Sequence, residues 1–297
     1  MRTQKRFTPS VLDRYARIGR GTGSYHGYIP WHRVGRSDPA SAGRSHLTNW
    51  RNRLRETLSD KELDGLHFSL MLKNLIDVRE QFPLQLQEWQ HETADYDICH
   101  FGKRVSGTLD IAQYLGIKHP LVHGEGRSEP WTMTTDQLLA FSDHGSVELL
   151  AIAFKPDSAA LTKRNLQLLA IEREYWAVRS VPWLLITPSQ YEKSVALTLR
   201  RSAPWALSEP VPPTALKIVV EIAYENTERS LAVVIGMIGD KLGGVSIAQN
   251  SFWQAVWNGD LPLDLRRGWR PHLPIDVVSQ AEFYAFNPIA ARRTAWN

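Results

Sequence analysis

The carboxylate of Asp136 and the ammonium group of Lys155 are the side chains whose types and spacing first suggest chemistry. Both lie in the stretch 131–156, WTMTTDQLLAFSDHGSVELLAIAFKP, on either side of a turn. A carboxylate can help to hold a divalent cation, and a lysine beside it can neutralise an anionic group. The same two residues can also form an ordinary cross-strand ion pair. Residue types alone leave both interpretations open.

The residues around this pair predict a β-hairpin. Residues 133–141 and 147–154 are each long enough for a strand, and Asp143-His144-Gly145 is a hairpin turn signal. A turn centred on residues 143–144 makes paired positions sum to about 287–289, so Asp136 faces roughly Ala151–Ala153. The lysine of the second arm shares the parity of these alanines and lies on the same face. The two charges then converge at one edge of the hairpin, as in a metal-dependent nuclease site or a simple ion pair.

A helix is predicted to begin after Ser59. Ser59-Asp60-Lys61-Glu62 fits the capping box S-x-x-E. Apolar residues follow at helical spacing, namely Leu63, Leu66, Leu70 and Met71. Glu62 therefore has a structural task at the third helical position, and on spacing alone this capping role is the favoured interpretation.

The remaining elements of the first half complete an α/β pattern. Residues 75–84 predict a strand that ends at Pro83, and residues 158–179 predict a long helix. Trp183–Thr187 predicts a buried strand. The order helix, strand, hairpin, helix, strand is typical of a sheet with a helix packed on each side.

The composition is that of a globular chain. Its 297 residues are 43% hydrophobic and 22% charged, which is compatible with two domains or one large one. Cys99 is the only cysteine, so a disulfide framework and a Cys-rich zinc site are excluded. No apolar run approaches the roughly 18 residues of a membrane span, and the first residues, MRTQKRFTPS, do not resemble a signal peptide. We expect a cytoplasmic protein without membrane contact.

Positive charge is concentrated at the start of the chain. Residues 1–55 hold twelve Lys and Arg and only two Asp, a net charge of +10, whereas the remainder has a net charge of −6. This arm predicts contact with a polyanion such as DNA, although a solvated basic tail has the same composition. Five side chains are the candidates for DNA contact, namely Arg20, Arg44, His46, Arg51 and Arg53. Gly19-Arg20-Gly21-Thr22-Gly23 is only a weak match to a phosphate loop.

The stretch 85–130 carries fewer signals. Several acids and histidines, namely Glu88, His91, Asp95, Asp97, His100 and His119, match no zinc spacing, and we interpret this stretch as a surface insertion. Ile117–Pro120 is predicted to open a short strand that returns towards the hairpin.

Composition changes after Pro188, which divides the chain into predicted domains 1–188 and 189–297. Four prolines between Ser202 and Thr214 suggest a semi-rigid linker. Three helices are predicted beyond it, at 215–225, 228–242 and 246–257, with Gly243-Gly244 as the turn before the last.

The stretch Arg266–Pro271 is basic and could form a wing, so the second domain suggests a winged helix-turn-helix. Phe252, Trp253 and Trp257 lie on the candidate recognition helix. Reading of the major groove uses Arg, Lys, Asn or Gln, so these aromatic residues favour the alternative, a helical bundle that binds protein.

Several stretches together resemble the TnsA family, the endonuclease subunits of heteromeric cut-and-paste transposases. They are GRGTG at 19–23, YIPW at 28–31, GRSH at 43–46, LSDKEL at 58–63, DVREQFPL at 77–84, IKHP at 117–120, TTDQLL at 134–139, AFKP at 153–156 and IEREYW at 171–176. They occur in the order of the family and extend to about residue 183. The last third resembles the family only in general character.

The resemblance implies a mixed sheet of the restriction-endonuclease type, flanked by helices and followed by a mostly helical, winged-helix-like domain. Asp136 would be the metal-binding aspartate, Lys155 the catalytic lysine and Glu62 a catalytic metal ligand on a helix. Glu172, in IEREYW, corresponds to a further acidic residue and would be a third metal ligand. The implied cofactor is Mg²⁺ or Mn²⁺.

One position departs from the family pattern. An acid or a glutamine is expected two residues before the lysine, and this chain has Ala153. A methyl group cannot coordinate a cation, so the missing ligand must be a water, a backbone carbonyl or another carboxylate, with Glu172 and Glu148 as candidates.

The resemblance also implies an activity and its partners. Such a subunit cleaves the non-transferred strand at the 5′ ends of a transposon, together with a DDE-type transposase and an AAA+ regulator. Its C-terminal domain would contact the regulator, with DNA as a second candidate. Two alternatives stay open, a stand-alone restriction-type or junction nuclease and a catalytically silent scaffolding subunit. The bacterial cytoplasm is the expected location.

Overall fold

The structure is a computed structural model that describes residues 6–36, 38–40, 44–96, 102, 104–157 and 162–296, apart from the side chain of Asp143. Cys99, Asp97, His100, Gly43 and residues 158–161, on which some of the expectations above rest, lie outside the described residues. The chain forms two compact units. The first consists of Met1–Leu63, Asn74–Thr187 and Ala295–Asn297, and the second of Asp64–Lys73 and Pro188–Thr294. The second unit thus also contains a ten-residue segment of the predicted first domain.

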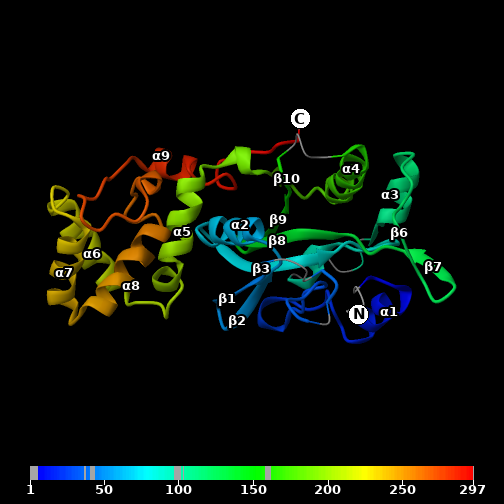
Figure 1. Ribbon diagram of the computed structural model, residues 1–297, viewed down its shortest axis with the longest axis horizontal. Coiled ribbons are helices and arrows are strands. Elements are labelled where there is room, and N and C mark those ends of the chain that lie inside the picture. The colour runs from blue at the N-terminus through cyan, green and yellow to red at the C-terminus, as the bar shows by residue number, and fades with distance from the viewer. Residues whose placement is uncertain are drawn as a thin grey trace, which may run out of the picture. The chain divides into compact units, whose positions relative to one another are not determined.

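A four-stranded mixed sheet organises the first unit (Figure 1). Its order is β10 (Trp183–Ile186), β9 (Ser146–Phe154), β8 (Thr134–Asp143) and β3 (Leu75–Pro83). The β3–β8 and β8–β9 pairs are antiparallel, and β10 runs parallel to β9. The predicted succession of helix, strand, hairpin, helix and strand along the chain and the mixed character of the sheet are confirmed.

The β8–β9 hairpin has the predicted register. Gln137 pairs with Ile152, and Asp143 pairs with Ser146, so paired positions sum to 289. His144 and Gly145 form the two-residue turn with φ of 45° and 90°. Left-handed φ at both positions is the requirement of a type I′ turn, which matches the twist of the flanking strands.

One face of the sheet packs against α3 (Thr108–Tyr114) and α4 (Lys163–Ala177). The core there combines sheet residues such as Leu138 and Ala151 with Tyr175 and Trp176 of α4. The fully buried indole N–H of Trp176 donates to Thr135 at 2.7 Å. This burial anchors α4, and with it Glu172, over the sheet.

The other face carries the start of α2 (Asp60–Leu70). A separate hairpin, β1 (His46–Trp50) and β2 (Arg53–Thr57), contacts the edge strand β3, where the Val78 carbonyl accepts from Arg53 and Arg55 at 2.7 Å each. The amide of Gln137 donates to the backbone carbonyl of Glu62 at 3.3 Å, so the first turn of α2 lies on this face. The predicted helix on each side of the sheet is therefore confirmed.

The stretch 85–130 is not the surface insertion that the sequence suggests. It contains the short pairs β4 (Trp89–Gln90) with β5 (Arg104–Val105) and β6 (Leu121–Gly124) with β7 (Arg127–Pro130). His91 and Glu92 are buried, and Glu92 binds the guanidinium group of Arg179. The strand predicted to open at 117–120 begins instead at Leu121 and pairs with β7. The remaining elements of the first unit are α1 (Pro9–Arg17) and the 3-10 turns Tyr25–Gly27 and Glu92–Asp95.

The second unit is helical. It contains α5 (Lys193–Ala206), α6 (Pro213–Glu225), α7 (Leu231–Leu242), α8 (Val245–Trp257), α9 (Gln280–Ala285) and the 3-10 turns Pro188–Gln190 and Leu265–Arg267. The predicted linker is partly wrong, because Ser202–Ala206 ends α5 with Pro204 inside the helix, and Pro213 occupies the first turn of α6. Ser202 is fully buried and accepts a hydrogen bond from the indole of Trp257 at 3.0 Å, so the segment belongs to the core.

The recognition-helix interpretation does not fit α8. Helices α7 and α8 meet at 112° across the predicted glycine turn, an angle typical of a helix-turn-helix. However, every residue from Ser251 to Trp257 is buried, so the second half of α8 forms the core of this unit. A helix in that position cannot present this half to a DNA groove.

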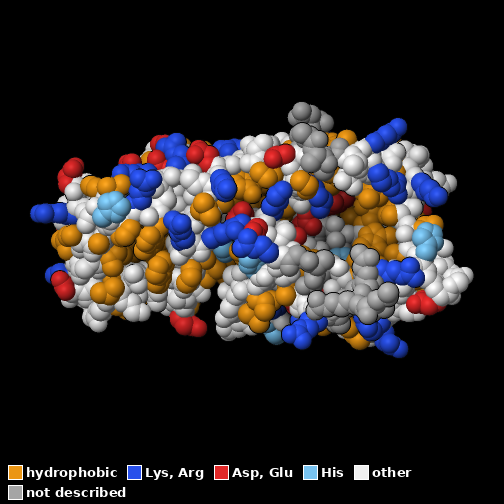
Figure 2. Space-filling model, viewed as in Figure 1, with side chains coloured by type: hydrophobic (Ala, Val, Ile, Leu, Met, Phe, Trp, Pro, Cys, Tyr) orange, Lys and Arg blue, Asp and Glu red, His pale blue; other side chains and the backbone are white. Residues whose placement is uncertain are grey.

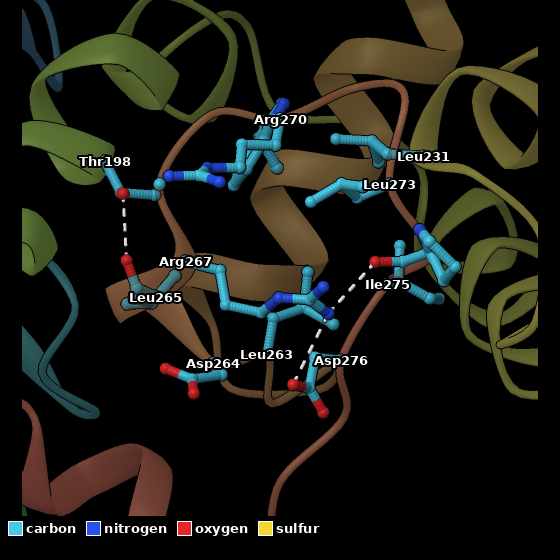
Figure 3. A pocket seen from close by; sticks show the side chains of 13 residues that line it. Thr198, Leu231, Leu263, Asp264, Leu265, Arg267, Arg270, Leu273, Ile275 and Asp276 are labelled. Carbon is cyan, nitrogen blue, oxygen red and sulfur yellow. Dashed lines mark hydrogen bonds and ion pairs between the residues drawn. The ribbon is translucent and has the colours of Figure 1, made fainter.

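The predicted wing is a loop rather than a pair of strands in the part of the chain described. Isolated antiparallel bridges, Leu263 with Val277 and Ser230 with Pro274, close it. Inside the loop, Arg267 binds the backbone carbonyl of Pro274 at 3.2 Å and the carboxylate of Asp276 at 3.4 Å (Figure 3). The arginine thus ties the loop together.

Across the described residues, no single helix has the length and apolar composition of a membrane span. The consecutive helices α7 and α8 pass that test only when they are taken together, despite their bend.

Candidate active site

Asp136 and Lys155 meet at the end of the β8–β9 hairpin. Lys155 Nζ donates to Asp136 Oδ2 at 2.9 Å, and the backbone N–H of Phe154 donates to the same oxygen at 2.7 Å. Burial by itself lowers the pKa of Lys155, but the charges of Asp136 and Glu172 outweigh it and raise the pKa above its usual range. The ammonium group therefore stays protonated at neutral pH and acts as a fixed positive charge.

An irregularity in the sheet lies at the level of Asp136. Gln81 of β3 has a left-handed φ of 50° and lies between the pairs Glu80–Gln137 and Phe82–Thr135. Glu80 binds Arg53 on one face of the sheet, whereas Phe82 packs on the other face against Trp176. Residues two apart in a regular strand share a face, so the alternation is broken here. At the same level, β8 contacts α4 through Thr135 and α2 through Gln137.

Glu62 performs the predicted capping task and also faces the site. Its backbone N–H donates to Ser59 Oγ at 3.2 Å, and its carboxylate accepts from the Ser59 hydroxyl at 3.0 Å and from the Leu58 N–H at 2.9 Å. The side-chain amide of Gln81 also donates to it at 3.0 Å. Burial, followed by the charge of Asp136, raises the pKa of Glu62 to about 7. The two interpretations of Glu62 are thus compatible.

Glu172 approaches the pair from α4. Its carboxylate accepts from the Thr135 hydroxyl at 2.8 Å and from the Trp183 indole at 3.2 Å. The side chain is 3% exposed, and burial raises its pKa to about 7 although the charge of Lys155 opposes this shift. Glu172 and Lys155 line the same pocket. A third carboxylate therefore stands beside the lysine.

The alanine that departs from the family pattern has an apolar environment. Ala153 is fully buried and packs with Leu169 of α4 and Leu185 of β10. Glu172 follows Leu169 by three residues on the same face of the helix. Glu148 cannot replace the missing ligand, because it is exposed and lies five residues back along β9, roughly 17 Å away at strand spacing. Glu172 is the acid that the fold brings to this position.

The donor set fits a cation that keeps much of its water. Among the described residues, no three His, Cys, Asp or Glu side chains gather into a group that could hold a metal ion. Glu62 and Asp136 nevertheless lie close enough for the charge of one to raise the pKa of the other, and a cation would relieve this repulsion. Mg²⁺ is often held by one or two carboxylates and several waters, so this pair suits it.

The five candidates for DNA contact divide into two groups. Arg20 and Arg53 are buried in ion pairs with Asp38 at 2.5 Å and Glu80 at 2.7 Å, so their guanidinium groups are not available to phosphates. The prediction that Arg20 and Arg53 contact DNA is therefore wrong. The other three are more accessible, namely Arg44, with a side chain 80% exposed, His46, and Arg51 at the exposed tip of the β1–β2 hairpin. Contact of these three with DNA stays a prediction.

Several residues that hold the carboxylates of the site were not predicted from the sequence. Gln81, Thr135 and Trp183 hold the carboxylates, although they carry no charge and follow no chemical spacing. Gln81 and Thr135 lie inside the motifs DVREQFPL and TTDQLL, which was the one available signal. Their roles depend on a break in strand alternation that periodicity cannot show.

Comparison with known proteins places this site in a family. The family model described as TnsA-like endonuclease N terminal matches residues 73–188, which include Asp136, Lys155 and Glu172. Over 220 residues the chain is 30% identical to the transposon Tn7 transposition protein TnsA of Escherichia coli, covering 73% of this chain and 69% of that protein. The sheet edge with its lysine and carboxylates thus lies in a chain that belongs to the TnsA family of transposition endonucleases.

Proposed function

We propose that this protein is a Mg²⁺- or Mn²⁺-dependent DNA endonuclease that cleaves the non-transferred strand at the 5′ ends of a transposon. The observation that carries the proposal is the convergence of Asp136 and Lys155 at the hairpin edge, with Glu62 and Glu172 coupled to them by charge. Family membership supports the reaction class, and this arrangement supports the metal dependence and the site.

Each residue has a distinct task in the proposed reaction. Asp136 and Glu62 would hold the cation, which supplies Lewis acidity and an acidified water. The Phe154 N–H fixes one carboxylate oxygen of Asp136, and Ser59 with Gln81 fixes the carboxylate of Glu62. Lys155 neutralises charge on the scissile phosphate or orients the attacking water, because its raised pKa keeps it cationic.

Glu172 is suited to accept a proton. A carboxyl group with a pKa of about 7 is partly ionised at neutral pH, which is the favourable range for a general base. Its contacts with Thr135 and Trp183 hold it beside Lys155. Glu172 could also contribute to cation binding, since its ionised carboxylate is the form that accepts a proton and the form that binds a cation.

We further propose that the protein acts within a complex. The E. coli relative is a transposition protein, and we infer by analogy a DDE-type transposase subunit, an AAA+ regulator and transposon-end DNA as partners in the bacterial cytoplasm. The second unit is the candidate for contact with the regulator, because its surface includes exposed apolar side chains, namely Tyr224, Val233, Met237 and Val245.

Cleavage of end-labelled transposon-end DNA by the full chain with its transposase subunit tests the proposal. Asp136→Ala should reduce 5′-end cleavage by at least about 10³-fold in Mg²⁺, because it removes a cation ligand and the partner of Lys155. Cleavage that survives this substitution would overturn the assignment of the site. Efficient cleavage by the protein alone would instead indicate a stand-alone nuclease.

Ala153 favours one other candidate, a catalytically silent scaffolding subunit. Calorimetric titration with Mn²⁺ distinguishes the two functions. The nuclease predicts a binding site that Asp136→Asn abolishes, whereas a scaffold predicts that both proteins give the same trace. A titration without any site of this kind would favour the scaffold.

A further inference from the structure

A pocket opens beside the candidate active site within the first unit. Its volume is about 240 Å³, far above the roughly 10–15 Å³ that one water needs. Nine residues line it, namely Trp131, Met133, Thr134, Lys155, Pro156, Asn165, Leu168, Leu169 and Glu172. Two of them, Lys155 and Glu172, belong to the site described above. The pocket and the reactive centre are therefore continuous.

The walls of the pocket combine apolar and polar side chains and include one aromatic ring that its neighbours hold in place. Trp131 stacks on the buried ring of His32 at 5.6 Å between centroids, and Phe7 meets it edge-on at 4.6 Å. Met133 and Leu169 add buried apolar surface. In Figure 2, hydrophobic side chains gather in a hollow below α4, with Lys and Arg side chains around it. A flat apolar group with a neighbouring negative charge matches this surface.

Asn165 adds a polar group at the mouth of the pocket. It lies in the first turn of α4, where its backbone N–H is bonded to Thr162 Oγ1 at 3.1 Å. Its side-chain amide has no hydrogen-bond partner among the residues that the structure describes. A primary amide can both donate to and accept from the edge of a base.

We propose that this pocket binds one unpaired nucleobase next to the scissile phosphate. The inference rests on the proposed nuclease function, because Lys155 would place the phosphate at the mouth of the pocket. The nucleotide attached to that phosphate is then the group nearest the apolar walls. A base inside a duplex is stacked and cannot enter a pocket, so it must leave the helix, as in enzymes that flip bases. Trp131 supplies the stacking surface and Asn165 the edge contact.

Abasic scanning of transposon-end DNA tests the pocket. Single abasic residues are placed on either strand within three nucleotides of the cleavage position, and affinity is measured by fluorescence anisotropy with full-length Asp136→Ala protein. At one position, loss of the base should weaken binding about tenfold, because the stacking contact is lost. Loss of the opposing base should strengthen binding, because less pairing has to be broken.

Two substitutions on α4 form a matched pair. Leu168→Trp fills the pocket and should remove both effects, whereas Leu166→Trp adds the same side chain at a position that is 42% exposed and outside the pocket, and should preserve both. Asn165→Trp blocks the exposed mouth without repacking of the core and serves if Leu168→Trp does not fold.

The outcomes separate this inference from the proposed function. The pocket assignment is overturned if no position gives the two opposite effects, or if they persist when Leu168 or Asn165 is replaced by Trp. That result leaves the nuclease assignment intact as long as Asp136→Ala abolishes cleavage. Conversely, cleavage by Asp136→Ala would refute the nuclease site even if the abasic pattern were present.

Discussion

At the scale of single residues, the site places three carboxylates around the one ammonium group of Lys155. Asp136 contacts Lys155 directly, while Glu62 and Glu172 raise its pKa from a greater distance. The two glutamates have a pKa of about 7 because burial disfavours their ionised forms. In the absence of a cation, these carboxylates therefore cost stability at neutral pH.

The pH dependence of stability should reveal this cost. A pKa of about 7 in the folded protein, against 4.5 for an ordinary glutamate, means that Glu172 destabilises the fold progressively as pH rises from about 4.5 to 7. Glu172→Gln should therefore raise the free energy of unfolding by up to about 3 kcal/mol at pH 8 in chelator, and by little at pH 4.5. Denaturant titrations at both pH values measure this, with the exposed Glu148→Gln as the control. A gain of equal size at the two pH values would refute the explanation.

At the scale of elements, one hairpin and two helices position the acids of the site. The β8–β9 hairpin supplies Asp136 and Lys155, the first turn of α2 supplies Glu62, and α4 supplies Glu172. The cap of α2 both stabilises the helix and orients an acid of the site, because the hydroxyl of Ser59 contacts both the backbone and the carboxylate of Glu62.

Two separate cap substitutions, one in α2 and one in α9, should distinguish the effect on helix stability from the effect on cleavage. Ser279 caps α9 as Ser59 caps α2, in each case by accepting from a glutamate N–H at 3.2 Å. Each Ser→Ala substitution should lower the free energy of unfolding by about 1 kcal/mol. Only Ser59→Ala should also lower Mg²⁺-dependent cleavage, since only that hydroxyl orients an acid of the site. Equal cleavage by the two variants would show that the hydroxyl of Ser59 acts on the helix alone.

Local sequence patterns predicted some of these elements correctly and one of them wrongly. The turn at His144-Gly145 and the capping box were predicted correctly because each depends on neighbours in the sequence. The prediction of a linker around Pro204 is wrong, because buried packing maintains the helix α5 there despite the proline.

At the scale of the whole molecule, the basic arm is only partly a charged surface. Arg20 and Arg53 hold the first unit together through buried ion pairs, whereas Arg44 and Arg51 remain exposed. The chain also returns to its first unit at the end, where the Ala295 N–H donates to the Leu185 carbonyl at 2.7 Å and Trp296 packs on Trp183. Trp183 in turn holds Glu172, so the last residues support the site.

Alanine substitutions should separate the two kinds of arginine. Arg53→Ala leaves the buried carboxyl group of Glu80 without its partner, and should lower the free energy of unfolding by about 3–5 kcal/mol. Arg44→Ala and Arg51→Ala should leave stability within about 0.5 kcal/mol and each reduce the salt dependence of DNA binding by about one phosphate contact. Thermal melts and anisotropy titrations at several salt concentrations provide both quantities. An unchanged salt dependence in the exposed variants would remove the arm from the DNA interface.

Sequence alone determined the β8–β9 hairpin, the cap of α2 and the central pair of charges, because strand length, turn chemistry and parity act over a few residues. The convergence of Asp136 and Lys155 followed from that local geometry. Only the tertiary structure decided that Glu172 stands beside Lys155, that Ala153 is packed in apolar surroundings, and that Arg20 and Arg53 form ion pairs with buried acids. These features depend on contacts between segments far apart in the chain, where packing and desolvation set the position and protonation of each group.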